Sequence, residues 1–281
     1  MTTFVNTPFG ALEGTEQDGV YRFLGVPFAE KPLGELRFRA PQMVRPWTET
    51  RQATGYEKDP MQANLVLGPE HYSEDCLYLN LWVPETTAKK LPVMVWVPGG
   101  AFATGGSGAV DPEGPSIYDC QQLAKDGGCI VVSISYRLNV FGFLNLSQFS
   151  SRFDDNIGMR DIIMALRWVQ EAIASFGGDP ENVTLVGESA GGEAISALLL
   201  IDEAKPYFHK AIIESNCFGS FYTQEEEREI CELYLQYAGL TADKAEGLLT
   251  LPYEKLIEAG RALDAYVAEH YTGRCSFCPV V

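Results

Sequence analysis

The sequence predicts an α/β fold, in which helices cover both faces of a sheet, and two observations support this. Short runs rich in β-branched and other apolar residues recur along the chain, at 77–83, 92–97, 129–135, 182–187 and 210–215. Strands that are apolar on both faces belong in a covered, largely parallel sheet. Segments with helical periodicity alternate with these runs, which is typical of the α/β class.

Two segments between and after these runs are expected to be helices. The segment 158–178 places four apolar side chains on one face, at steps of four, three and four residues: Ile162, Leu166, Val169 and Ile173. Two glycines, 177–178, then supply a stop signal. The acidic segment 223–239 predicts a second helix capped at Thr223, and its run of charges is interpreted as a solvated face.

Length and charge limit the classes of protein that remain. The chain has 281 residues, of which 46% are hydrophobic, so residues 1–281 can form one large domain. Its formal net charge of −17 disfavours nucleic acid and anionic membrane surfaces as partners. The first residues contain no basic segment followed by an apolar run, and no apolar stretch has the length of a membrane span. A soluble, cytoplasmic protein is expected.

Seven cysteines are scattered over the chain, an odd number that favours reduced thiols over a disulfide framework. Cys275 and Cys278 have the spacing of a redox motif or of half a zinc site. No second pair of this spacing exists, and no histidine pair has metal-ligand spacing. The favoured interpretation is two incidental cysteines near a strand, with no metal and no cofactor. Redox or metal chemistry at this pair remains a third alternative.

The segment NVTLVGESAGGE, residues 182–193, carries the strongest chemical signal. An apolar strand, a G-x-S-x-G turn and a helix follow one another, as in a nucleophile elbow that lifts a serine hydroxyl above the sheet. The backbone approaches itself closely in such a turn, and small residues permit this: Gly187, Ala190, Gly191 and Gly192. Ser189 is therefore predicted to be a nucleophile, and a plain turn serine is the weaker alternative.

A glycine-rich loop, VPGGAFATGGSG at 97–108, follows an earlier strand. In hydrolases with an elbow, such a loop supplies backbone N–H groups to the oxyanion that develops on the substrate. Gly100, Ala101 and Ala190 are the expected donors. A phosphate-binding loop is excluded because no Gly-Lys-Ser or Gly-Lys-Thr ends the segment.

These motifs together resemble the type B carboxylesterase family, which includes para-nitrobenzyl esterases and cholinesterases. The resemblance runs from about residue 3 to the last residue, through FLGVPFAEKPLGELRFRAP, EDCLYLNLWVP, PVMVWVPGGAF, VSISYRLNVFGFL and the elbow region. It implies an α/β-hydrolase fold with a central, mostly parallel sheet, and hydrolysis of a small-molecule carboxylic ester through an acyl-enzyme at Ser189. It also implies that the main chain of 99–101 builds the oxyanion hole, and that Glu188 resembles the family's buried acid beside the nucleophile.

Three positions depart from the family pattern. Pro98 stands where the family often has His or Tyr, and Ala101 where it often has Gly. Met61 stands where secreted members place the cysteine that pairs with the equivalent of Cys76. The resemblance therefore implies that Cys76 stays free, in agreement with a cytoplasmic location.

The base that Ser189 needs is not evident. In this fold the order along the chain is Ser, then Asp or Glu, then His. His71 precedes Ser189, His209 matches a position where the family has a structural histidine, and His270 matches no family motif. The final FCPVV resembles the family's strand that leads toward the acid.

The sequence therefore predicts the N-terminal portion of a single hydrolase domain that stops before the last strands of the sheet. The acid and the histidine would lie on a segment or chain outside this sequence. Either a second polypeptide or a homodimer would then cover the exposed sheet edge. The alternative function is a catalytically silent hydrolase-fold protein used for interaction.

Overall fold

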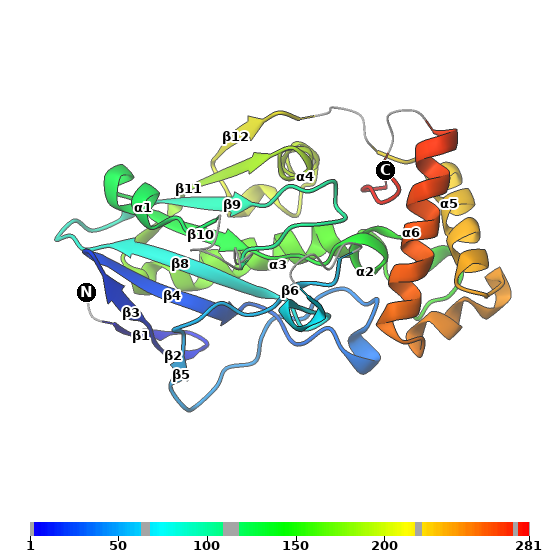
Figure 1. Ribbon diagram of the computed structural model, residues 1–281. Coiled ribbons are helices and arrows are strands. Elements are labelled where there is room, and N and C mark those ends of the chain that lie inside the picture. The colour runs from blue at the N-terminus through cyan, green and yellow to red at the C-terminus, as the bar shows by residue number, and fades with distance from the viewer. Residues whose placement is uncertain (1–2, 63–67, 109–117, 217–220, 272–274, 281) are drawn as a thin grey trace.

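The computed structural model describes residues 3–62, 68–108, 118–216, 221–271 and 275–280. A seven-stranded sheet forms its centre, in the order β12-β11-β9-β10-β8-β4-β3 (Figure 1). The strands are β3 (Thr15–Gln17), β4 (Val20–Pro27), β8 (Tyr78–Pro84), β9 (Leu91–Val97), β10 (Ile130–Ile134), β11 (Gly178–Glu188) and β12 (Lys210–Glu214). All five apolar runs of the sequence are thus strands of one sheet.

Half of this sheet is parallel and half is antiparallel. β12, β11, β9 and β10 run parallel, and the active-site segments come from this part. β8 pairs antiparallel with β10, and β4 and β3 follow in antiparallel pairings. The expectation of a mostly parallel sheet therefore holds for only one side, because an apolar run shows that a strand is buried but not in which direction it pairs.

Two small sheets and six α-helices complete the fold. β1 (Phe4–Thr7), β2 (Gly10–Glu13) and β5 (Arg51–Gln52) form one small sheet, and β6 (Asp59–Pro60) and β7 (Tyr72–Ser73) form the other. The α-helices of the described residues are α1 (Gln121–Gly127), α2 (Asn139–Phe143), α3 (Ile157–Ala172), α4 (Ala190–Leu198), α5 (Gln224–Tyr237) and α6 (Tyr253–His270). None of them is long and apolar enough to cross a membrane.

The predicted helix at 158–178 is confirmed as α3, which continues into the 3-10 helix η4 (Ile173–Phe176). Its predicted apolar face is fully buried, with no accessible surface at Ile162, Leu166, Val169 or Ile173. Gly177, with φ of +84°, ends it in the left-handed conformation that glycine adopts without strain.

The two faces of the sheet bury side chains in separate clusters. The large cluster contains the apolar face of α3 and most of the strand side chains. The small one lies under α1 and consists of Val20, Leu24, Trp82, Ala124, Cys129 and Val131. Because successive side chains of a strand point to opposite faces, β8 contributes Leu81 to one cluster and Trp82 to the other.

Helices α5 and α6 lie side by side at one end of the molecule, beside the end of the chain (Figure 1). The cap predicted at Thr223 is confirmed. Its hydroxyl accepts a hydrogen bond from the Glu226 N–H, and the Glu226 carboxylate accepts one from the Thr223 N–H. The solvated-face interpretation fails at Glu227, which has no accessible surface. Its carboxylate accepts a hydrogen bond from the Asn145 N–H at 3.1 Å.

Burial raises the pKa of Glu227 from 4.5 to about 8, so this side chain makes stability depend on pH. Between these values the unfolded chain has lost the proton that the folded chain keeps, and stability falls as pH rises. Glu227→Gln removes this titration. Relative to the variant, the wild type is expected to lose on the order of 2–4 kcal/mol of unfolding free energy between pH 5 and pH 8.

Urea unfolding of both proteins at the two pH values measures this difference. Glu229→Gln, which replaces an exposed carboxylate on the same helix, is the control and should leave the pH dependence unchanged. A difference between wild type and Glu227→Gln that is equal at pH 5 and pH 8 would contradict the prediction.

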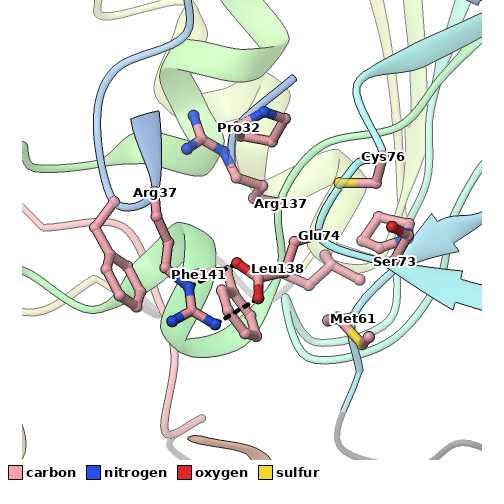
Figure 2. A pocket seen from close by; sticks show the side chains of 11 residues that line it. Pro32, Arg37, Met61, Ser73, Glu74, Cys76, Arg137, Leu138 and Phe141 are labelled. Atoms are coloured by element: carbon pink, nitrogen blue, oxygen red, sulfur yellow. Dashed lines mark hydrogen bonds and ion pairs between the residues drawn. The ribbon is translucent and has the colours of Figure 1, made fainter. Parts of the chain in front are cut away.

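Arg37, which is paired with a partly buried carboxylate, connects the N-terminal region to the end that carries α5 and α6. Its guanidinium pairs with both carboxylate oxygens of Glu74 (Figure 2). One of its nitrogens also donates to the carbonyls of Leu248, Leu249 and Leu251. Replacing either partner would leave a buried charge unpaired.

A small cavity, lined in part by Arg37 and Glu74, tests the expectation about Cys76. Met61 and Cys76 both line it (Figure 2), and Cys76 is a free, buried thiol. The other cysteines that the structure describes are free too, and Cys217 lies outside the described residues. The expectation of reduced thiols therefore holds for the described part of the chain.

Candidate active site

Ser189 occupies the sharp turn between β11 and α4. Its φ of +57° and ψ of −123° are strained for a residue with a side chain. Two hydrogen bonds hold this conformation: the Ser189 N–H donates to the Glu214 carbonyl at 2.9 Å, and the Ser189 carbonyl accepts from the Glu193 N–H at 2.9 Å. The half-buried serine thus stands at the carboxyl end of β11, as the elbow motif predicts.

The glycines of the motif are required by close backbone contacts. A Cβ on Gly191 would lie 2.1 Å from the Val97 carbonyl oxygen, and one on Gly187 would lie 2.6 Å from the Gly191 carbonyl carbon. A Cβ on Gly99 would lie 2.5 Å from the Glu188 carbonyl oxygen. These contacts bring the elbow, residues 187–191, against the loop that follows β9.

That loop, residues 98–105, is held rigidly. The Tyr136 hydroxyl donates to the Pro98 carbonyl at 2.5 Å, and the Thr104 N–H donates to the Gly100 carbonyl at 2.9 Å. Gly100 has a φ of +113°, and Ala101 has a φ of +53°. Because of these unusual φ values, the backbone of the loop departs from the extended conformation of β9, and its peptide groups point in other directions.

The three predicted oxyanion donors come from these two segments. Gly100 and Ala101 belong to the loop, and Ala190 begins α4, where the first N–H groups of a helix have no partner within the helix. Among the residues that the structure describes, the N–H groups of Gly100, Ala101 and Ala190 donate to no acceptor. They are available to a developing negative charge, and their role in catalysis stays a prediction.

A cavity of about 150 Å³ opens beside the loop 98–105, which is called the oxyanion loop below. Its wall joins the loop to α6 and to the end of the chain, through Ala101, Ala103, Asp264, Val267, Cys275 and Phe277. The sequence did not predict that α6 or Cys275 would lie here, because this contact joins residues more than 150 positions apart. No local pattern carries such a signal.

No hydrogen bond joins a histidine to Ser189 among the residues that the structure describes. His209 accepts the Val183 N–H at 3.3 Å, in the middle of β11, six residues or about 20 Å from the serine. His71 lies 3.8 Å from Glu70. His270 is exposed at the end of α6, where its ring stacks on Tyr266 at 4.0 Å. Within the described residues, Ser189 therefore has no histidine partner.

Glu188 differs from the expectation of a buried acid, because its side chain is exposed in this chain. It pairs in register with Glu214 of β12, the outermost strand of the described sheet, so little covers it. Its charge still reaches neighbouring groups: burial first, and then the Glu188 carboxylate, raise the pKa of Tyr118. The family resemblance also implies that Glu188 tunes the site electrostatically, and this stays a prediction.

No group of three or more His, Cys, Asp or Glu side chains that could hold a metal is found within the described part of the chain. Burial raises the pKa of Asp59 to about 7, and its carboxylate accepts the Gly108 N–H at 3.0 Å. The elbow and the neighbouring loop bring a serine hydroxyl close to a set of backbone N–H groups.

Known proteins are similar to this chain in sequence. The chain is 41% identical over 264 residues to a para-nitrobenzyl esterase of Bacillus subtilis, covering 92% of this chain and 53% of that protein. It is 37% identical over 262 residues to a phenmedipham hydrolase of Pseudarthrobacter oxydans, covering 90% of this chain and 50% of that protein. The chain thus spans about half the length of the curated relatives it matches.

Solved structures agree with the fold. A PNB esterase superposes with a TM-score of 0.90 at 39% identity, covering all of this chain and 57% of the other. A carboxylesterase of Geobacillus stearothermophilus gives a TM-score of 0.87 at 38% identity, covering 99% and 55%. The fold is that of the α/β-hydrolases. The model of the carboxylesterase family matches residues 1–281, and the chain belongs to this family.

Proposed function

We propose that this chain carries the nucleophile and the oxyanion hole of a serine carboxylesterase. The observation that carries the proposal is the strained conformation of Ser189, which two hydrogen bonds hold at the elbow. The elbow contacts the loop 98–105, and the N–H groups of Gly100 and Ala101 in this loop have no acceptor among the described residues. The relatives are esterases or hydrolases by name, which supports the same reaction class.

In the proposed reaction, the Ser189 hydroxyl attacks the carbonyl carbon of a small-molecule ester while a base takes its proton. The carbonyl oxygen becomes negative and accepts hydrogen bonds from the N–H groups of Gly100, Ala101 and Ala190. The alcohol leaves with a proton, and water then hydrolyses the acyl-enzyme at Ser189. No cofactor is needed.

The acid and the histidine of the triad are proposed to come from a segment or chain outside this sequence. Two observations support this: no described histidine approaches Ser189, and the chain spans about half the length of its relatives. A Cys76 thiol that stays free opposite Met61 supports a reducing, cytoplasmic location.

The experiment is hydrolysis of para-nitrophenyl acetate by the chain together with the polypeptide that completes the site, followed by labelling with a fluorophosphonate, which reacts with activated serines. Hydrolysis together with labelling of the elbow peptide supports the proposal. A preparation in which the second polypeptide is present but neither reaction occurs would favour the alternative, a silent protein used for interaction. The isolation of Ser189 from any described histidine is the observation that favours this alternative.

The oxyanion loop offers a sharper test. Gly100→Ala would place a Cβ 2.3 Å from the Thr104 carbonyl oxygen at a φ of +113°, so the loop must move and its donors with it. The expected loss is on the order of 10²–10³ in kcat, as for one oxyanion donor.

Ala101→Gly is the matched control for this loss. It keeps the N–H group, and glycine tolerates the φ of +53° at this position without strain, so kcat is expected to stay close to that of the wild type. Steady-state hydrolysis of para-nitrophenyl acetate measures both variants. Equal rates for the two would show that the oxyanion is held elsewhere.

A further inference from the structure

The first cysteine of the CSFC segment lies in the wall of the cavity beside the oxyanion loop, and the second follows three residues later. Cys275 lines this cavity together with Ala101 and is half-buried, whereas Cys278 is buried with 2% of its surface exposed. The Cys278 thiol donates to the Cys275 carbonyl at 3.7 Å, so the two thiols lie close together. One cysteine therefore lines the cavity, and its partner is buried beside it.

Hydrogen bonds from elsewhere in the fold hold this segment in place. The Tyr222 hydroxyl donates to the Cys275 carbonyl at 2.7 Å. Asn156 both donates to the Val280 carbonyl and accepts its N–H, each at 2.9 Å. Hydrogen bonds thus anchor the segment 275–280 at both of its ends, and the fold holds the two cysteines near each other.

The contact makes the two thiols unequal. Donation from Cys278 lowers the pKa of Cys275 to about 7, although burial and the charges of Asp264 and Glu193 oppose the shift. The same hydrogen bond, together with burial and the charge of Glu227, raises the pKa of Cys278. The interaction therefore favours the thiolate of Cys275, and thiolate is the reactive form.

Other described thiols lack this combination of access and activation. Cys76 and Cys231 are buried, and burial raises the pKa of each far above its ordinary value. Cys120 is half-buried like Cys275, but burial raises its pKa to about 12. Cys120 is therefore a matched control, because its side chain is half-buried like that of Cys275 but its pKa is not lowered.

We propose that Cys275 and Cys278 form a dithiol site that peroxides oxidise to an intramolecular disulfide. The Cys275 thiolate attacks one peroxide oxygen, the O–O bond breaks, and hydroxide leaves as Cys275 becomes a sulfenic acid. The sulfur of Cys278 then attacks the Cys275 sulfur, an S–S bond forms, and the S–O bond breaks. The departing hydroxide and the proton from Cys278 form water. The two thiols supply the two electrons that reduce one peroxide to two waters.

Mass spectrometry of the full chain, together with any polypeptide it is isolated with, tests the proposal after treatment with hydrogen peroxide at pH 7. The expected product is a disulfide between Cys275 and Cys278 that dithiothreitol reverses. In Cys278→Ser the reaction should stop at a Cys275 sulfenic acid, which dimedone traps. Cys120→Ser should form the disulfide as the wild type does. Peroxide that leaves both thiols reduced in the wild type, or that joins either of them to another cysteine, overturns the proposal.

A second measurement needs no variant and no ester hydrolysis, so it stands apart from the proposed function. Iodoacetamide at pH 7 should alkylate Cys275 on the order of 10² times faster than Cys120. The pKa values of the two thiols differ by about five units, so their thiolate fractions at pH 7 differ by about 10⁵. The more basic Cys120 thiolate is intrinsically more nucleophilic, which reduces the expected ratio of rates to about 10². Equal alkylation rates would overturn the proposal even if every variant folds poorly.

Discussion

Replacing Ser189 with alanine is expected to lower kcat for ester hydrolysis by on the order of 10⁶, as for loss of the nucleophile in serine proteases. The hydroxyl is the group that forms the acyl-enzyme, and no other described serine occupies an elbow. The oxyanion donors would remain in place, so a small residual rate over water is expected. Initial rates with para-nitrophenyl acetate, in the presence of the polypeptide that completes the site, measure the loss.

Two features make this variant interpretable. Alanine keeps a Cβ at the strained φ of +57°, so the strain stays and the melting temperature should stay close to that of the wild type. Ser196→Ala is the matched control. Its hydroxyl donates to the Gly192 carbonyl on the same helix at 3.0 Å, and its loss should leave both the rate and fluorophosphonate labelling intact.

Fluorophosphonate labelling gives an independent measure, because it depends on the activated hydroxyl and not on turnover of an ester. The wild type and Ser196→Ala should be labelled, and Ser189→Ala should not. Equal labelling of wild type and Ser189→Ala would remove Ser189 from the reaction altogether.

The elbow and the helices around it could be predicted because local chemistry determines them. The apolar period of 158–178 requires a helix, Thr223 and Glu226 form a capping box, and the small residues of 187–191 permit a sharp turn. Each of these signals lies within a few residues of the element that it determines.

Features that depend on distant segments could not be predicted in the same way. The antiparallel direction of β8 depends on its neighbours in the sheet. The cavity beside Ala101 depends on the docking of α6 and Cys275. Glu227 is an intermediate case: it lies three, four and seven residues before Ile230, Cys231 and Tyr234, all buried, so helical spacing placed it on the buried face. The surrounding acidic residues concealed that signal.

The exposed edge of the sheet leads to the second large prediction. β12 is the outermost strand next to the elbow strand, and it pairs with β11 on one side only among the described residues. Most of its side chains are exposed, including Ile212 with 41% of its surface accessible. A strand edge of this kind presents unpaired N–H and C=O groups, and it recruits another strand or aggregates.

We therefore expect a second polypeptide to pair with β12 and to bring the acid and the histidine to Ser189. The chain with this partner should hydrolyse para-nitrophenyl acetate on the order of 10⁶ times faster than the chain alone, because a serine without its base retains only the effects of the oxyanion hole and of substrate binding. Sedimentation and mass spectrometry of the purified material identify the partner. A homodimer with an idle serine would instead support the silent interaction protein.

Ile212→Asp tests whether the partner binds at this edge. A carboxylate there would be desolvated on pairing, so the variant should bind the second polypeptide more weakly and lose hydrolysis in proportion, while Ser189 itself is untouched. Leu200→Asp is the matched control, because Leu200 is 80% exposed and lies after α4 rather than on β12. Its binding and its rate should equal those of the wild type. A monodisperse 281-residue monomer that hydrolyses esters at the full rate would refute the two-chain arrangement and would make His270, at the end of α6, the histidine to test next.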